Sequence, residues 1–265
     1  MKLLRRATEP EVIAEFLKNE FYQREFNRDR EYFENLVKNA DTTVEQENAL
    51  RRALLFRRRG PMWRELPDDI QWWKVELEAG DLDRLFVFPR AHWRKLAGGN
   101  FRLTEIVERL RARVSAPLRD APVGRAPRNI AEFVSKIHSL SRRLKQQAQS
   151  GSVLLIGTDE TEPMLIFEGN HRLTAALLDS GNSYSTNQFQ IFLGRSPRMV
   201  RCCWYRSSLL NLLRYAKNRV LHIGYDRDAD IGRIMKQMEQ NPSYIDVMNP
   251  GKVLPESKSA PTNFT

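Results

Sequence analysis

The sequence predicts an α+β (mixed α/β) fold in which an N-terminal helical region precedes a small mixed-sheet domain. Residues 1–80 carry apolar side chains at helical spacing, whereas residues 81–206 alternate short apolar runs with helical patterns. A length of 265 residues suits one large domain or two small ones, and it is enough to bury a core without disulfides. We expect C-terminal helices over 207–249 and a disordered tail over 250–265, which is rich in Pro, Ser, Asn and Lys.

In the N-terminal region, residues 1 to about 78 are expected to form a helical region. The apolar spacing predicts helices over Glu11–Phe26, Asp29–Val37 and Val44–Phe56. Gly60 and Pro61 follow three arginines and indicate the end of the third helix. The five tryptophans are irregularly spaced, so we expect them to pack in the core rather than to stack on bases.

In the mixed-sheet region, β-branched and aromatic runs predict strands, and 3.6-residue periodicity predicts helices. The expected strands are Leu85–Phe88, Val153–Ile156, Met164–Phe167, Phe189–Leu193 and Val200–Tyr205. The expected helices are Leu103–Val114, a basic helix from Ile130 capped by Asn129, Leu173–Leu178 and Ser207–Leu221. A proline-containing loop is expected over 116–128, and Asp179–Asn182 should end the short helix.

The net charge is +10, which indicates an anionic partner. Between Ile106 and Ser150 the chain has ten Lys or Arg and three Asp or Glu, so this segment holds +7 of the total. Its helix carries four cations that are candidate contacts to phosphate or nucleic acid: Lys136, Arg142, Arg143 and Lys145. Arg195, after a predicted strand, is a further candidate contact to an anion.

Cysteine content and hydropathy exclude several classes of protein. The two cysteines, Cys202 and Cys203, are adjacent, which excludes a disulfide framework and a cysteine-based zinc site. They are expected to lie in the core on a strand rather than to act as nucleophiles. No apolar run reaches 18 residues, so no transmembrane helix and no membrane partner are expected, and the expected location is the cytoplasm.

The most informative motif is Glu168-Gly169-Asn170-His171-Arg172, where a predicted strand runs directly into a helix. Gly169 permits a tight turn, and the first turn of a helix offers free N–H groups to a phosphate. Arg172 can add a bidentate contact, His171 can donate or accept a proton, and Glu168 can bind Mg²⁺ or act as a general base. The structural alternative is that Gly169 only closes the turn, Glu168 pairs with Arg172, and His171 caps the helix.

On this motif the chain resembles the ParB/sulfiredoxin-like superfamily over its second half. In that fold, a helix precedes a β-hairpin whose second strand runs into a phosphate-binding glycine turn. Sulfiredoxins carry Gly-Cys-His-Arg at this step, ParB proteins carry Gly-Glu-Arg-Arg, and free-serine kinases of the fold carry Asp-Gly-His-Thr-Arg. The resemblance implies nucleotide contacts by Gly169, Asn170, His171 and Arg172. Asn170 stands at the position of the sulfiredoxin catalytic cysteine, so the resemblance does not extend to sulfinic-acid reduction.

The function expected first is a nucleotide-dependent enzyme, an ATP- or NTP-dependent phosphotransferase or an NTP hydrolase. Glu168 and His171 would be its catalytic residues and Glu168 its Mg²⁺ ligand, with ATP or another NTP bound at the turn. Its partners would be an acceptor of unknown identity and a second copy of the chain in a homodimer. The alternatives are a ParB-like DNA-binding protein or nuclease that uses the basic segment, and a non-catalytic nucleotide sensor or scaffold.

Overall fold

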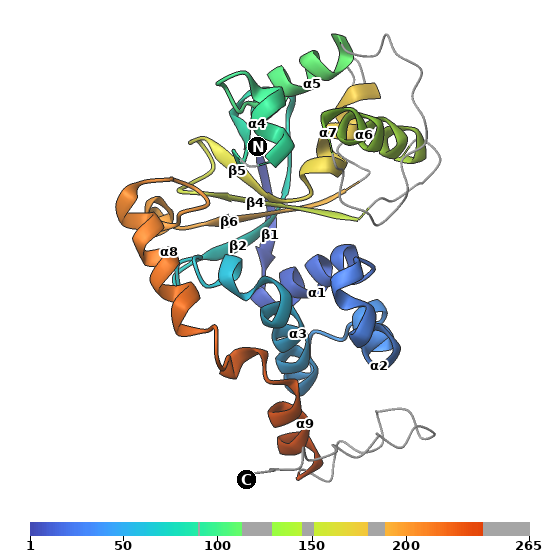
Figure 1. Cartoon of the computed structure of the whole chain (residues 1–265), viewed down its shortest axis with the longest axis vertical. Helices are drawn as coiled ribbons and strands as arrows, with labels where there is room; N and C mark the ends of the chain where they lie inside the picture. The colour runs from blue at the N-terminus through green and yellow to red at the C-terminus, as the bar shows by residue number, and fades with distance from the viewer. Residues whose placement is uncertain (90, 113–128, 145–150, 180–188, 241–265) are drawn as a thin grey trace, which may run out of the picture.

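A computed structural model describes the chain except for residues 90, 113–128, 145–150, 180–188 and 241–265. It contains a six-stranded mixed sheet with helices packed on both faces, so the predicted α+β class is confirmed (Figure 1). The strands are β1 (Lys2–Ala7), β2 (Gln71–Glu76), β3 (Leu85–Val87), β4 (Ser152–Gly157), β5 (Met164–Glu168) and β6 (Gln190–Arg195). Lys145, the 116–128 loop, the helix stop at Asp179–Asn182 and the 250–265 tail fall wholly or mainly outside the described residues.

The strand order in the sheet is β1-β2-β6-β4-β5-β3. The pairs β4–β6 and β3–β5 are parallel, and the remaining neighbours are antiparallel. All six residues of the central strand β4 are buried, as expected for a strand covered by helices on both faces. Its alternate residues enter two separate cores: Leu154 and Ile156 face one helical layer, and Val153 and Leu155 face the other.

One face of the sheet carries the N-terminal helices α1 (Glu9–Glu20), α2 (Asn27–Lys38) and α3 (Glu45–Trp63), together with α9 (Ile231–Glu239) (Figure 1). The opposite face carries α4 (Ala91–Ala97), α5 (Leu103–Ala112), α6 (Ile130–Leu144) and α7 (Asn170–Asp179). A further helix, α8 (Leu209–Leu221), lies at the left edge of the view in Figure 1. Short 3₁₀ turns cover Arg24–Phe26, Ala79–Arg84, Pro197–Arg201 and Arg227–Ala229.

The prediction that residues 1 to about 78 form a helical region is wrong for β1 and β2. β1 is an edge strand whose side chains are mostly exposed, so its Lys and Arg residues face water and hide the apolar alternation that marks a strand. β2 pairs with β6, Trp73 opposite Leu193, and thereby joins the N-terminal part of the chain to the central sheet. Long-range pairing rather than local propensity decides both segments.

The proline at position 61 does not end α3 where the sequence predicts. The helix includes Pro61 and continues to Trp63, which is 4% exposed. Trp63 packs against Phe16 and Trp72 with ring centroids 5.6 and 6.1 Å apart. The missing hydrogen bond of Pro61 is therefore tolerated where the following turn is fixed by an aromatic core.

The strand predicted over Val200–Tyr205 is also wrong. Pro197–Arg201 forms a 3₁₀ turn whose first N–H groups are capped by Ser196. Arg206 N then donates to Cys202 O at 2.9 Å, so the backbone turns again instead of extending. The prediction that Cys202 and Cys203 are core residues is confirmed, because both are unpaired and at most 3% exposed. Burial raises their thiol pKa to about 11 and about 12, respectively, which disfavours the nucleophilic thiolate.

Candidate functional site

The Glu168–Arg172 motif forms the predicted step from strand to helix. β5 ends at Glu168, Gly169 has φ +95°, and α7 begins at Asn170. A Cβ atom on Gly169 would lie 3.0 Å from Val153 Cγ2 and 3.3 Å from Ser152 O. Because Gly169 has no side chain, the backbone at this turn can lie directly against β4. The first turn of α7 therefore packs beside the start of that strand.

Arg172 is held at the start of β4 by protein contacts. Its Nη2 donates to Ser152 O at 3.0 Å and lies 3.4 Å from Glu168 Oε1. The ion pair between Glu168 and Arg172, which we expect if the motif has only a structural role, is thus present. Two polar atoms of the motif are nevertheless buried without a hydrogen-bond partner among the described residues: Arg172 Nε and Asn170 Oδ1. Buried polar atoms usually have a hydrogen-bond partner, and a polar ligand or a water molecule would supply one to each of these two atoms.

The end of α1 reaches the same place, although the sequence analysis did not find it. Asn19 Nδ2 donates to Ser152 Oγ at 2.6 Å and to Ser152 O at 3.2 Å, and Asn19 Oδ1 accepts from Ser152 N at 3.3 Å. A Cβ atom on Gly151 would lie 2.3 Å from Asn19 Oδ1, and Gly151 has φ +95°. This second glycine therefore lets α1 dock directly beside Arg172.

Glu20 is the next residue and the second carboxylate of the site. It is 7% exposed and accepts a hydrogen bond from Arg59 Nη2 at 2.9 Å. Burial and the Glu168 carboxylate raise the Glu20 pKa to about 7, against the opposing effect of Arg59 and Arg172. We call Glu20, Arg59, Lys136, Glu168 and Arg172 the Glu20–Glu168 cluster. A sequence signal for Glu20 exists, because it is the charged residue on the buried stripe Ile13, Phe16, Leu17 and Glu20 of α1.

The basic helix α6 contributes one cation, Lys136, to this cluster. Burial lowers the pKa of Lys136. The positive charge of Arg143 lowers this pKa further, whereas the negative charge of Glu20 raises it. Lys136 and Arg143 are two turns apart and so share a side of α6. Arg142 and Arg143 are both exposed, and Arg142 donates to Ser139 Oγ at 3.4 Å. The predicted cap is present, with Glu132 N donating to Asn129 Oδ1 at 2.9 Å. Lys145 lies outside the described residues.

His171 has an aromatic environment. Its ring centroid lies 5.3 Å from that of Trp93 and 5.3 Å from that of Phe133. These rings belong to the core on the α4–α7 face of the sheet. The motif thus divides, with Glu168 and Arg172 beside Glu20 and His171 packed among aromatic side chains. This packing accounts for His171 without a proton-transfer role, and its catalytic role stays a prediction.

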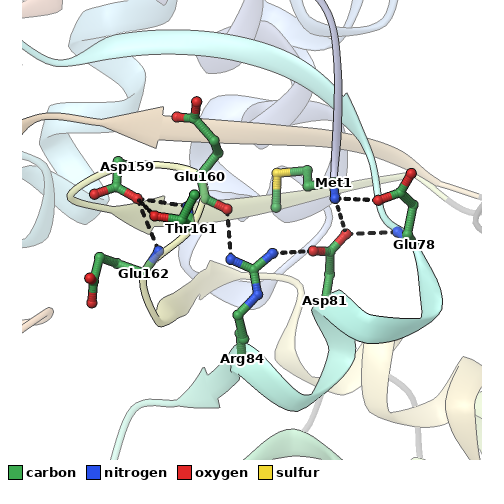
Figure 2. Close-up of polar contacts among 8 residues, drawn as sticks. All are labelled: Met1, Glu78, Asp81, Arg84, Asp159, Glu160, Thr161 and Glu162. Carbon is green, nitrogen blue, oxygen red and sulfur yellow. Dashed lines mark hydrogen bonds and ion pairs between the residues drawn. The ribbon is translucent and has the colours of Figure 1, made fainter.

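Arg195 lies at the opposite end of the sheet from the motif. On β4 its partner is Gly157, whereas Glu168 pairs with Leu154, about 10 Å away along the strand. Arg195 forms an ion pair with Glu160 and lies over the Trp73 ring at 5.0 Å. Figure 2 shows the same turn, in which Arg84 donates to Glu160 O and Asp159 accepts from the N–H groups of Thr161 and Glu162. These residues therefore stabilise a turn remote from the Glu20–Glu168 cluster.

Comparison with protein-family models, curated proteins and solved structures finds no significant match, so the resemblance to the ParB/sulfiredoxin-like superfamily stays a prediction. Within the described residues, no group of three or more His, Cys, Asp or Glu side chains is placed to hold a metal ion. Among the residues that the structure describes, Glu20 and Glu168 are the carboxylates that interact at the motif. Among the described helices, none has the length and apolar character needed to cross a membrane.

Proposed function

We propose that the chain binds the phosphates of a nucleotide at the Glu20–Glu168 cluster and acts as an ATP- or NTP-dependent phosphotransferase or NTP hydrolase. The observation that supports this most directly is the buried Arg172 Nε, which has no acceptor although Arg172 stands at the N-terminal turn of α7. A phosphate oxygen would supply that acceptor, and Arg59 and Lys136 add positive charge beside it.

The two carboxylates suit distinct tasks in such a reaction. Glu20, with a pKa of about 7, can accept a proton from an acceptor hydroxyl or a water molecule near neutral pH. Glu168 offers carboxylate oxygens of the kind that Mg²⁺ prefers, and a divalent cation would relieve its repulsion with Glu20. Mg²⁺ would supply charge neutralisation for the transferred phosphoryl group. We therefore propose Glu20, rather than the Glu168 expected from the sequence, as the general base.

The nucleic-acid alternative has less support. Lys136 is half-buried beside Glu20 rather than displayed on an open basic face. A nuclease would need clustered metal-binding carboxylates, and Asp159, Glu160 and Glu162 lie on the remote turn. A non-catalytic sensor would use the same phosphate contacts and would be recognised by binding without turnover. The cytoplasmic location is also a proposal, which the two unpaired cysteines support.

The proposal is tested by thermal shift with ATP, ADP, GTP and CTP, each with and without Mg²⁺. A nucleotide present at 100 times its Kd should raise the free energy of unfolding of the wild type by about 2.7 kcal/mol. Arg172→Gln should lose most of this ligand-dependent shift, whatever it does to the melting temperature without ligand. Glu20→Gln should retain the shift but lose phosphate release or transfer, measured with the best-binding nucleotide.

The matched control is Arg195→Gln, which removes a half-buried arginine paired with a carboxylate at the other end of the sheet. It should keep the full ligand-dependent shift. Absence of a shift with every nucleotide would refute the proposed function. An equal loss in Arg172→Gln and Arg195→Gln would also contradict it, because the effect would then be general destabilisation.

A further inference from the structure

Helix α8 presents its apolar side to solvent and its polar side to the protein. Asn211, 3% exposed, donates from Nδ2 to Val200 O at 2.9 Å and to Arg206 O at 2.7 Å. One turn later the Tyr215 ring packs on Trp204, with centroids 5.4 Å apart, and Asn218 Nδ2 donates to Glu65 Oε1 at 2.7 Å. These three residues at i, i+4 and i+7 form the inner side of α8. The helix is thus oriented opposite to an ordinary surface helix.

The outer side is a continuous apolar stripe. It consists of Leu209, Leu213, Ala216, Val220 and, just beyond the helix, Ile223, spaced by four, three, four and three residues. The four large side chains are 76%, 59%, 67% and 73% exposed. Alternating spacings of four and three are those of the seam in a coiled coil, where each side chain packs between side chains of a facing helix. The stripe therefore has the pattern of a surface that packs against another helix.

The stripe is also nearly symmetric about its centre. In an antiparallel pair of α8 helices that cross at Ala216, Leu209 of one copy faces Ile223 of the other, and Leu213 faces Val220. The small side chain of Ala216 would sit on the two-fold axis, where the helices approach most closely. A two-fold interface requires such a self-complementary order. We propose that α8 is the interface of a homodimer in which two copies pair antiparallel through this stripe.

The exposed area agrees with a dimer. With the exposed side chains of Leu210, Leu212 and Tyr225, and leaving out Leu221, residues 209–225 present on the order of 800 Å² of apolar residue surface, above the roughly 300–600 Å² of a monomer's largest patch. This is close to the ~800 Å² per partner of a standard interface.

The charge around the stripe gives the pairing a distinctive salt dependence. From Pro197 to Tyr225 the chain has six Lys or Arg and no Asp or Glu, and Arg214, Lys217 and Arg219 lie exposed along α8. Two copies therefore repel each other electrostatically at the rim while their apolar seams attract. Salt screens the repulsion, so the dimer should tighten as the salt concentration rises. Binding of the same face to an anionic lipid surface would weaken instead.

The experiment is sedimentation equilibrium of the full chain at 1–100 µM, in roughly 50 mM and 500 mM NaCl. The wild type should approach twice the 31.0 kDa chain mass, with a lower dimer Kd at the higher salt concentration. Leu213→Glu, at the seam, should be monomeric throughout. The matched control is Leu221→Glu, which changes an equally exposed leucine of α8 outside the seam and should keep the dimer. Both side chains are exposed, so circular dichroism should show unchanged folding.

Cross-linking tests the geometry separately. Ala216→Cys should form an intermolecular disulfide under mild oxidation, and Leu221→Cys should not; the buried native cysteines do not compete. A monomer at 100 µM in both salts would overturn the proposal, as would equal cross-linking of the two variants. Salt-sensitive binding of a monomeric chain to phosphatidylserine vesicles, abolished by Leu213→Glu, would assign the stripe to a membrane surface instead.

Discussion

At the scale of single residues, two glycines decide how the site is assembled. Gly169 and Gly151 both have φ +95°, and each lies where a side chain would strike a neighbouring segment. The sequence indicates a glycine turn at Gly169 but not what approaches it. A phosphate-binding loop and a turn packed on its own sheet both require glycine there, and only the three-dimensional arrangement shows that β4 is the neighbour.

Gly169→Ala should therefore destabilise the protein through two effects. Positive φ costs an alanine about 1–2 kcal/mol. Contact with Val153 Cγ2, Val153 Cα and Ser152 O at 3.0–3.3 Å should add about 1–3 kcal/mol, because β4 is a buried central strand. Gly99→Ala is the matched control, since Gly99 has φ +102° but no atom within 4 Å of a built Cβ. Urea unfolding should show a clearly larger loss for Gly169→Ala, and equal losses would contradict the packing argument.

Glu20 makes stability depend on pH. Its pKa is about 7 in the folded protein and 4.5 in a model peptide, so the folded state binds the proton more tightly. The contribution of Glu20 to stability is therefore complete below about pH 4.5 and is lost as the pH rises through about 7. Across this window the wild type should lose roughly 1–3 kcal/mol relative to Glu20→Gln.

The measurement for Glu20 is the free energy of unfolding by urea at half-unit steps from pH 4 to pH 8.5. The difference between wild type and Glu20→Gln should change sigmoidally with pH. Glu108→Gln, an exposed carboxylate on α5, should follow the wild type at every pH. A constant difference between wild type and Glu20→Gln would show that the buried carboxylate does not titrate in this range.

At the scale of elements, the sequence predicts best those segments whose own pattern decides their structure. β4, β5 and α7 have the predicted order, and Asn129 caps α6 as expected. The errors fall where distant pairing overrides local pattern: β1 is a charged edge strand, and β2 depends on β6. The sequence does not predict Glu20 and Arg59 as site residues for the same reason: about 110 residues or more separate them from Glu168, and no local motif links them.

At the scale of the whole molecule, the domain boundary expected at residue 80 divides elements that belong to one sheet and one core. β2, from the N-terminal part, lies between β1 and β6 in the sheet. The N-terminal helices cover one face of the central strands, including Leu154, Ile156 and Phe167. The candidate site is also divided, with Glu20 and Arg59 on one side of the boundary and Glu168 and Arg172 on the other. Neither part should therefore bind the proposed ligand alone.

A fragment of residues 81–265 should consequently fail to fold cooperatively. Without residues 1–80, β6 lacks its partner β2 and the apolar side chains of β4 and β5 on that face are exposed, a surface that favours aggregation. The matched control is the pair of fragments 1–80 and 81–265, which together contain every residue. They meet at Gly80, an exposed position with free space around it. Mixing fragments 1–80 and 81–265 should restore a cooperative thermal transition and dispersed amide resonances, because the strand pairing and core contacts are then all available and only the Ala79–Arg84 turn is cut. Cooperative melting and a dispersed amide spectrum for 81–265 alone would show instead that the mixed-sheet domain is autonomous and that the N-terminal layer is an addition to it.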